Sequence, residues 1–123
     1  SKIRPALNKV ALPDFKGICS ADIYPIRPSG SDLLRNFLFY LLLTESFLGF
    51  ATKHSDRSKI PKINRESLLS YRAPFPIPAE QERISNFLSS FDAQITTEAS
   101  KFDALKKHKQ ALMQQLFPTV EES

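Results

Sequence analysis

Glycine and cysteine are both scarce in this sequence of 123 residues. Gly17, Gly30 and Gly49 lie far apart, so no glycine-rich loop of the kind that cradles the phosphates of a nucleotide is predicted. Cys19 is the only cysteine, which excludes an intramolecular disulfide and favours a cytoplasmic location. No base stands beside Cys19 in the sequence, so we expect a small packed side chain rather than a nucleophile. No catalytic residue and no cofactor are predicted.

Long hydrophobic runs are also missing. The longest run, FLFYLLL, has seven residues and is far too short to span a bilayer. The N-terminal stretch SKIRPALNKV contains no apolar signal core, so no membrane partner is expected. His54 and His108 are far apart and lack companion cysteines, so no metal site is predicted. The length suits one domain, or one domain with an appendage.

The basic residues are concentrated in the first part of the chain. Residues 1–78 contain twelve Lys and Arg against six Asp and Glu, a net charge of +6. Residues 79–123 contain five against seven, a net charge of −2. The excess in the first part suits a polyanionic partner such as nucleic acid, although it also suits a protein that is merely soluble.

The first 78 residues are predicted to form an α+β domain with short strands around one buried helix. Residues 1–13 and 16–28 combine apolar residues with breakers and indicate extended segments, the second of them a strand. Residues 32–50 have apolar side chains on one broad face and predict a helix that belongs to the core. Ser31 or Asp32 could cap this helix, and Gly49 could end it.

Two further segments complete this part of the chain. Residues 51–64 are polar and basic and predict a loop. Residues 65–78 predict a short turn or helix followed by an extended, proline-rich segment.

A long helix is predicted from residue 79 to about residue 117, because neither glycine nor proline occurs between Glu80 and Pro118. Pro78 presets the backbone before it, and Glu80 and Glu82 suit the positive end of the helix dipole. At 1.5 Å per residue the helix is about 57 Å long, which is more than so small a domain can cover. Heptad spacing predicts a coiled-coil seam: Leu88, Phe91, Ile95, Glu98, Phe102, Leu105, Lys109, Leu112 and Leu116.

The run KIPKINRESLLSYRAPFPIPAEQERISNFLSSFDAQI, with the later LKKHKQALMQQLF, resembles the DNA-specificity (S) subunits of type I restriction-modification systems. Their pattern has spaced isoleucines, a proline junction followed by Glu-Gln, and a long helix ending near Leu-Phe. The positions that match are Ile60, Ile63, Leu68, Pro76, Pro78, Glu80, Gln81, Ile84, Leu88, Asp92, Ile95, Leu105, Lys109, Leu112, Gln115, Leu116 and Phe117. The upstream KIRPALNKVA and GICSADIYPIRP also resemble the family's target-recognition domain.

This resemblance implies a protein that reads double-stranded DNA and performs no chemistry itself. In the family, two target-recognition domains read a split target, and two long helices hold them apart and dock methyltransferase (M) subunits. Restriction (R) subunits join the assembly. The sequence has neither the aromatic-proline motif of an adenine methyltransferase nor a nuclease carboxylate-lysine cluster. In the family, a longer globular sequence precedes each helix and a second repeat is present, so this sequence resembles a fragment.

The resemblance divides the chain into a partial target-recognition domain at 1–78, a spacer and dimerisation helix at 79–117, and a tail at 118–123. Cations and short polar groups in one loop suit phosphates and base edges, and two basic residues near the N-terminus could touch the DNA backbone. The alternative is a solvated loop with incidental charges. The candidate DNA-binding residues are Lys53, His54, Ser55, Arg57, Ser58, Lys59, Arg4 and Lys9.

A second function class remains open, namely a coiled-coil module that assembles and reads no DNA. A homodimer is expected through the seam, since a second copy could supply the missing partner helix. The two polar seam positions, Glu98 and Lys109, would face each other twice in an antiparallel pair centred between Asp103 and Ala104. A centre nearer residues 95–97 would overlap more helix but lose that pairing.

Overall fold

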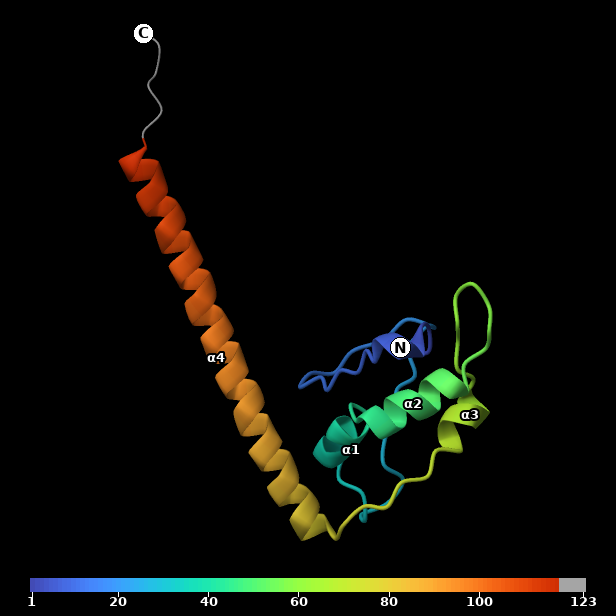
Figure 1. The fold of residues 1–123 in the computed structure, drawn as a ribbon. Helices are drawn as coiled ribbons and strands as arrows, with labels where there is room; N and C mark the ends of the chain where they lie inside the picture. Colours follow the sequence, from blue (N-terminus) through green and yellow to red (C-terminus); the bar gives the residue numbers. More distant parts are fainter. Residues whose placement is uncertain (118–123) are drawn as a thin grey trace. The chain divides into compact units, whose positions relative to one another are not determined.

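The computed structural model of the chain describes residues 1–117, and the tail expected at 118–123 lies outside the described residues. The elements are one turn of 3-10 helix, η1 (Pro5–Leu7), followed by four α-helices. These are α1 (Arg35–Leu41), α2 (Glu45–Lys53), α3 (Arg65–Leu69) and α4 (Pro78–Leu116). The loop between α2 and α3 extends away from both helices (Figure 1). The chain divides into two units, Ser1–Ser85 and Asn86–Ser123, and the boundary lies inside α4.

The predicted α+β class is wrong, because the described residues form helices and no sheet. The only strand-like pairing in residues 1–117 is an isolated antiparallel bridge between Ile3 and Lys62. A strand needs a ladder of bonds to a partner backbone. Residues 11–23 are all exposed and have one such bond, from the N–H of Lys2 to the carbonyl of Asp22 at 2.9 Å. Pro25 and Pro28 also lack the N–H group that a strand ladder requires. At the N-terminus, Pro5 starts η1, which replaces the expected extended segment.

The single helix predicted over residues 32–50 is also wrong, because α1 and α2 are separate helices. Thr44 has an extended backbone conformation and caps α2, since its hydroxyl oxygen accepts from the N–H of Phe47 at 3.3 Å. The same hydroxyl donates to the carbonyl of Leu41 at 2.7 Å, at the end of α1. Gly49 lies inside α2 and does not end it. The hydroxyl of Thr44 thus bonds the end of α1 and the start of α2, and this sets the break between the two helices.

The core of the first unit is small and lies between α2, the N-terminal segment and α3. Its buried apolar residues are Leu42, Phe47, Ala51 and Ile63. The partly buried residues packed against them include Val10, Tyr24, Leu38, Phe50, Leu68 and Tyr71. The ring of Tyr71 meets that of Phe47 edge-on, with centroids 5.1 Å apart. The apolar face predicted for residues 32–50 therefore does contribute to the core, although it is divided between two helices.

Gln81, in the first turns of α4, is completely buried and holds three segments together. Its side-chain oxygen accepts from the N–H of Leu34 at 2.8 Å. Its amide nitrogen donates to the carbonyls of Asp32 at 2.6 Å and Pro76 at 2.7 Å. The hydroxyl of Ser85, also buried, donates to the carbonyl of Gln81 at 2.7 Å. The glutamine after the proline junction is thus a structural residue that fixes the start of α4.

The long helix is confirmed as one continuous element of 39 residues, about 58 Å in length. Pro78 is its first residue, where a missing N–H costs nothing, and Glu80 lies in its first turn. Every residue from 89 to 117 is exposed.

Candidate nucleic-acid interface

A backbone bridge brings two basic segments together that are about sixty residues apart in the sequence. Ile3 pairs with Lys62. The N–H of Arg4 donates to the carbonyl of Pro61 at 2.7 Å, and the N–H of Ile63 donates to the carbonyl of Lys2 at 3.1 Å. The N-terminal segment is thereby fixed along one side of the loop that joins α2 to α3. The bridge places Arg4 beside the basic loop that the sequence singled out.

The backbone turns sharply on both sides of η1. Arg4, with φ 49°, and Asn8, with φ 46°, are in the left-handed region, and neither is glycine. Such a conformation costs roughly 1–2 kcal/mol per residue, so the surrounding contacts must hold it. Asn8 donates from its side chain to the carbonyl of Leu43 at 3.4 Å, which ties η1 to the junction between α1 and α2. The side chains of Arg4 and Lys9, both exposed, are presented from this fixed turn.

The loop from Asp56 to Lys62 is closed by hydrogen bonds at its base. The N–H of Asp56 donates to the carbonyl of Lys62 at 2.9 Å, and the N–H of Lys62 donates to the carboxylate of Asp56 at 3.1 Å. The hydroxyl of Ser58 donates to the same carboxylate at 2.7 Å. These bonds, first that of the Ser58 hydroxyl and then that of the Lys62 amide, hold the pKa of Asp56 below its ordinary value. The loop is therefore an ordered turn that presents Arg57 and Lys59.

The six candidate DNA-binding residues between Lys53 and Lys59 fall into two groups. Lys53, at the end of α2, and Arg57 and Lys59, in the loop, are exposed cations with no ion pair among residues 1–117. The remaining three side chains hydrogen-bond within the unit. Ser55 donates to the carbonyl of Thr52 at 2.7 Å, Ser58 bonds Asp56, and His54 Nδ1 meets the carbonyl of Phe50 at 2.9 Å.

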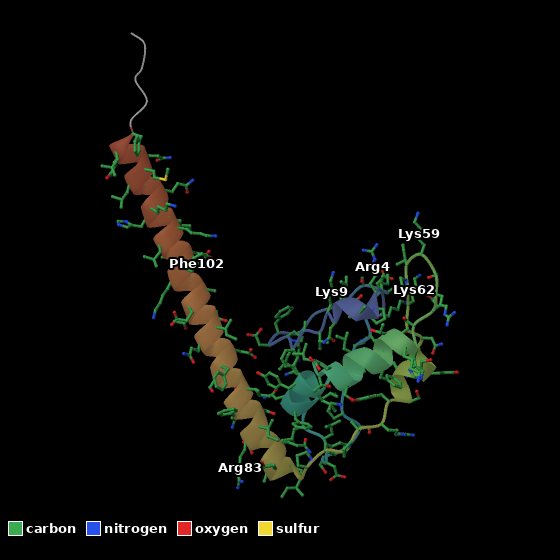
Figure 2. The ribbon with its side chains drawn as sticks, viewed as in Figure 1. Arg4, Lys9, Lys59, Lys62, Arg83 and Phe102 are labelled. Atoms are coloured by element: carbon green, nitrogen blue, oxygen red, sulfur yellow. The ribbon has the colours of Figure 1, made fainter. Side chains whose placement is uncertain are left out.

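Four cations lie on one side of the first unit. Figure 2 shows Arg4, Lys9, Lys59 and Lys62 along the edge formed by the N-terminal segment and the loop. Together with Arg57, an exposed cation of the same loop, they are called the basic surface here. No salt bridge in residues 1–117 engages any of them. Only the first unit contributes to this surface, which therefore does not depend on α4 beyond Ser85.

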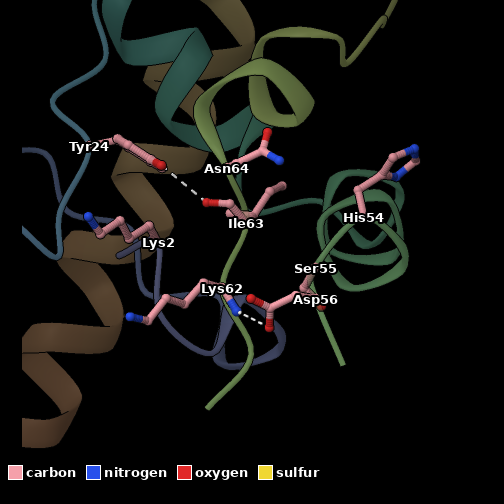
Figure 3. Close-up of a pocket in the computed structure, with 8 residues that line it drawn as sticks. All are labelled: Lys2, Tyr24, His54, Ser55, Asp56, Lys62, Ile63 and Asn64. Carbon is pink, nitrogen blue, oxygen red and sulfur yellow. Dashed lines mark hydrogen bonds between the residues drawn. The ribbon is translucent and has the colours of Figure 1, made fainter. Parts of the chain in front are cut away.

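An open hollow of about 380 Å³ lies beside the bridge and contains residues that the sequence did not single out. Its lining residues are Lys2, Tyr24, His54, Ser55, Asp56, Lys62, Ile63 and Asn64 (Figure 3). Lys62 follows the predicted loop residues closely, so an extension of the basic run by three positions would have found it. Nothing in the linear sequence indicates that Lys2 lies beside it, because only the bridge brings the two together.

The predicted seam residues all lie on α4, where the structure places most of them in solvent. Ile95, Phe102, Leu105 and Leu116 are 59–71% exposed. Phe91 is less exposed and meets the ring of Phe87 edge-on at 5.0 Å. In residues 1–117 no helix is long and apolar enough to cross a membrane. Within the same residues no group of three acidic, histidine or cysteine side chains could hold a metal ion.

Comparison with known proteins identifies the family of this chain. The model of the type I restriction modification DNA specificity domain matches residues 4–107. The chain belongs to this family. The match includes Arg4, the loop, Gln81 and most of α4. The resemblance inferred from the sequence is thus confirmed, and so is the expectation of a non-catalytic specificity component.

Two specificity subunits align with part of this specificity-domain chain. The type I restriction enzyme EcoDI specificity subunit of Escherichia coli is 43% identical over 84 residues, which cover 68% of this chain and 18% of that protein. The type I restriction enzyme MjaIX specificity subunit of Methanocaldococcus jannaschii is 28% identical over 75 residues, covering 61% and 17%. The alignments thus span less than a fifth of either relative. No solved structure matches the chain significantly.

Proposed function

We propose that this chain contributes DNA reading to a type I restriction-modification specificity subunit, with double-stranded DNA as its partner. In this proposal residues 1–78 contact the DNA, residues 79–117 are a spacer and dimerisation helix, and residues 118–123 are a tail. Methyltransferase and restriction subunits would carry out the chemistry, with the methyltransferase docking on the helix. A cytoplasmic location goes with this proposal.

The observation that carries the proposal is the convergence of cations from two distant segments on the basic surface. Arg4, Arg57 and Lys59 come from a strained turn and a tied loop, so their backbones are fixed before any ligand arrives. Fixed cations suit a duplex, whose phosphates recur at regular spacing and dominate the affinity. Ser55 and Ser58 are hydrogen-bonded inside the unit and are less suited to reading base edges.

The test is duplex affinity as a function of salt. Replacing Lys53, Arg57 and Lys59 together with alanine should weaken binding and flatten the salt slope by up to about 0.9 per lost phosphate contact. A matched control replaces Lys16, Arg27 and Arg72, three exposed cations of the first unit that do not belong to the basic surface, which removes the same charge. Equal affinity of the loop variant and the unmodified chain would remove the loop from the interface.

The second candidate function is a coiled-coil module that assembles without reading DNA. It is supported by the exposed apolar seam and by the charge pattern of α4. Residues 78–98 hold four acidic residues and one basic residue, whereas residues 99–116 hold four basic residues and one acidic residue. Two such helices that lie side by side attract each other only when they run antiparallel, because the acidic half of each then faces the basic half of the other. An antiparallel homodimer through the seam is therefore part of both proposals.

Failure of the unmodified chain to bind duplex DNA at low salt would favour this second function. Sedimentation at micromolar concentration reports the dimer independently of DNA. A monomer would exclude the homodimer and leave the seam for another helix.

A further inference from the structure

The hollow beside the bridge holds two lysines in fixed relative positions. The backbones of Lys2 and Lys62 belong to segments joined by the Ile3–Lys62 bridge and by the bond from Ile63 N–H to the Lys2 carbonyl. Figure 3 shows both ammonium groups on the same side of the hollow. The Lys2 ammonium also lies over the ring of Tyr24, 5.7 Å from its centroid. Two like charges on one hollow repel each other and thus favour an anion between them.

Most of the other polar groups of the hollow are already engaged. The hydroxyl of Tyr24 donates to the carbonyl of Ile63 at 3.2 Å. One carboxylate oxygen of Asp56 accepts from Ser58 and Lys62, and Asn64 accepts the N–H of Ser67 through its side-chain oxygen at 2.8 Å. Because the oxygen of Asn64 is used, its amide N–H groups are the part left for a ligand. The hollow therefore offers more donors than acceptors.

The charge balance points the same way. Asp56 is the only carboxylate lining the hollow, against Lys2 and Lys62. Its position is set by the bonds that close the loop, so it does not neutralise both lysines. The remaining positive charge continues the basic surface, because Lys62 belongs to both. A hollow rich in donors that continues a line of cations suits a tetrahedral anion with acceptor oxygens only.

We infer that this hollow binds a phosphate group, with Lys2 and Lys62 supplying charge and the Asn64 amide supplying a hydrogen bond. The inference rests on the proposed function in one respect, namely that the phosphate belongs to a DNA strand. Phosphate contacts fix position and carry no sequence information. The hollow then anchors the strand, and the hydrogen-bonded loop between Asp56 and Lys62 carries Arg57 and Lys59 beside that anchor.

The test removes one charge at a time from the full chain. Lys2→Gln and Lys62→Gln replace the ammonium group by a neutral polar amide on a slightly shorter side chain, and Lys107→Gln on α4 is the matched control. Each hollow variant should weaken duplex binding to a similar extent on different sequences and lower the salt slope by about 1, whereas the control should leave the slope nearly unchanged. The NMR signal of the Ile63 backbone amide, which donates to the Lys2 carbonyl, shows whether the bridge is intact in each variant.

A second arm separates DNA from free phosphate. Amide signals of Lys2, Lys62 and Asn64 are followed while inorganic phosphate is added at constant ionic strength, with the unmodified chain and with Lys62→Gln. If the chain binds duplex DNA but both hollow variants keep its salt slope, the hollow inference is overturned and the proposed function stands. If the chain binds no DNA, the proposed function fails. In that case, amide signals that move when phosphate is added to the unmodified chain but not to Lys62→Gln support the hollow as a site for free phosphate. If phosphate moves no amide signal of the unmodified chain, the hollow inference is overturned.

Discussion

Residues 1–85 are held together by contacts between segments far apart in the chain, whereas residues 86–116 form turns of one helix whose backbone bonds are local. In the first unit, Gln81 joins residues 32–34 to Pro76, and Ile3 pairs with Lys62. In the second, the residues from 89 onward are all exposed. The first unit therefore depends on a few nonlocal bonds, while the helix depends on propensity and on whatever covers its seam.

The sharpest test of this difference is Gln81→Glu, which keeps the shape of the side chain and removes both donors. A buried carboxylate would then face the carbonyls of Asp32 and Pro76. We expect the first unit to lose about 3 kcal/mol or more of unfolding free energy, because buried polar groups lose their partners. Tyr24, Tyr40 and Tyr71, the only tyrosines, all lie in this unit, so tyrosine fluorescence during denaturation measures it selectively.

The same variant has a characteristic dependence on pH. Burial raises the pKa of a carboxyl group above its unfolded value, so the loss of stability should be smaller at pH near 4 than at pH 7. Gln110→Glu, the same change at an exposed position of α4, should alter stability by less than about 0.5 kcal/mol. Equal stability of the Gln81 and Gln110 variants would show that the buried bonds do not hold the unit together.

The second prediction concerns the helix and has its effect on assembly. Phe102 is 59% exposed at the centre of the seam, and full burial of such a side chain is worth roughly 1.5–3 kcal/mol. In the proposed homodimer each copy contributes one, so Phe102→Asp should convert the dimer to monomer at micromolar concentration. Ser100→Asp adds the same charge on the outer face of the helix and should leave the dimer intact. Sedimentation of the unmodified chain and of the two variants measures their oligomeric states. The homodimer proposal is lost if Phe102→Asp still dimerises.

The sequence predicted the helix well because the information for it is local. Pro78, the absence of glycine after it and the heptad spacing of apolar residues all lie within the element that they define. The family resemblance depended on this same region. Gln81 was noticed as part of the family pattern, but its role as a buried donor and acceptor depends on the carbonyls of Asp32 and Pro76, which only the fold brings near.

The first unit was predicted less well because its structure depends on pairings that a linear pattern does not contain. Residues 16–28 alternate enough to indicate a strand, yet the N–H of Lys2 makes only a single backbone bond to them, at the carbonyl of Asp22, and no ladder forms. Residues 32–50 look like one helix until Thr44 is considered as a cap in its own right. The exposed cations of the loop could be identified from composition, whereas Lys2 and the hollow follow from a single bridge.

A smaller effect is expected at the break between α1 and α2. Thr44→Ala removes the acceptor for Phe47 N–H and the donor to Leu41, and should cost about 1 kcal/mol of unfolding free energy. Thr44→Ser keeps the hydroxyl and should restore most of this loss. Denaturation followed by tyrosine fluorescence measures both. Equal loss in the two variants would attribute the effect to packing of the threonine methyl group instead of to the cap.

The smallest effect is confined to the loop and depends on pH. The pKa of Asp56 is lowered, mainly by the Ser58 hydroxyl and then by the Lys62 amide, so its carboxylate stabilises the closed loop at neutral pH. That contribution is complete above the ordinary carboxyl value of 3.8 and is lost only as the pH falls through the lower folded value. The amide signals of Ser58 and Lys62 should therefore stay constant to about pH 4 and move together below it. Asp56→Asn keeps an acceptor oxygen without the titration and should abolish the pH-dependent movement while leaving the loop closed. A transition in the unmodified chain at or above the ordinary value would mean that the hydrogen bonds seen at the base of the loop do not persist in solution.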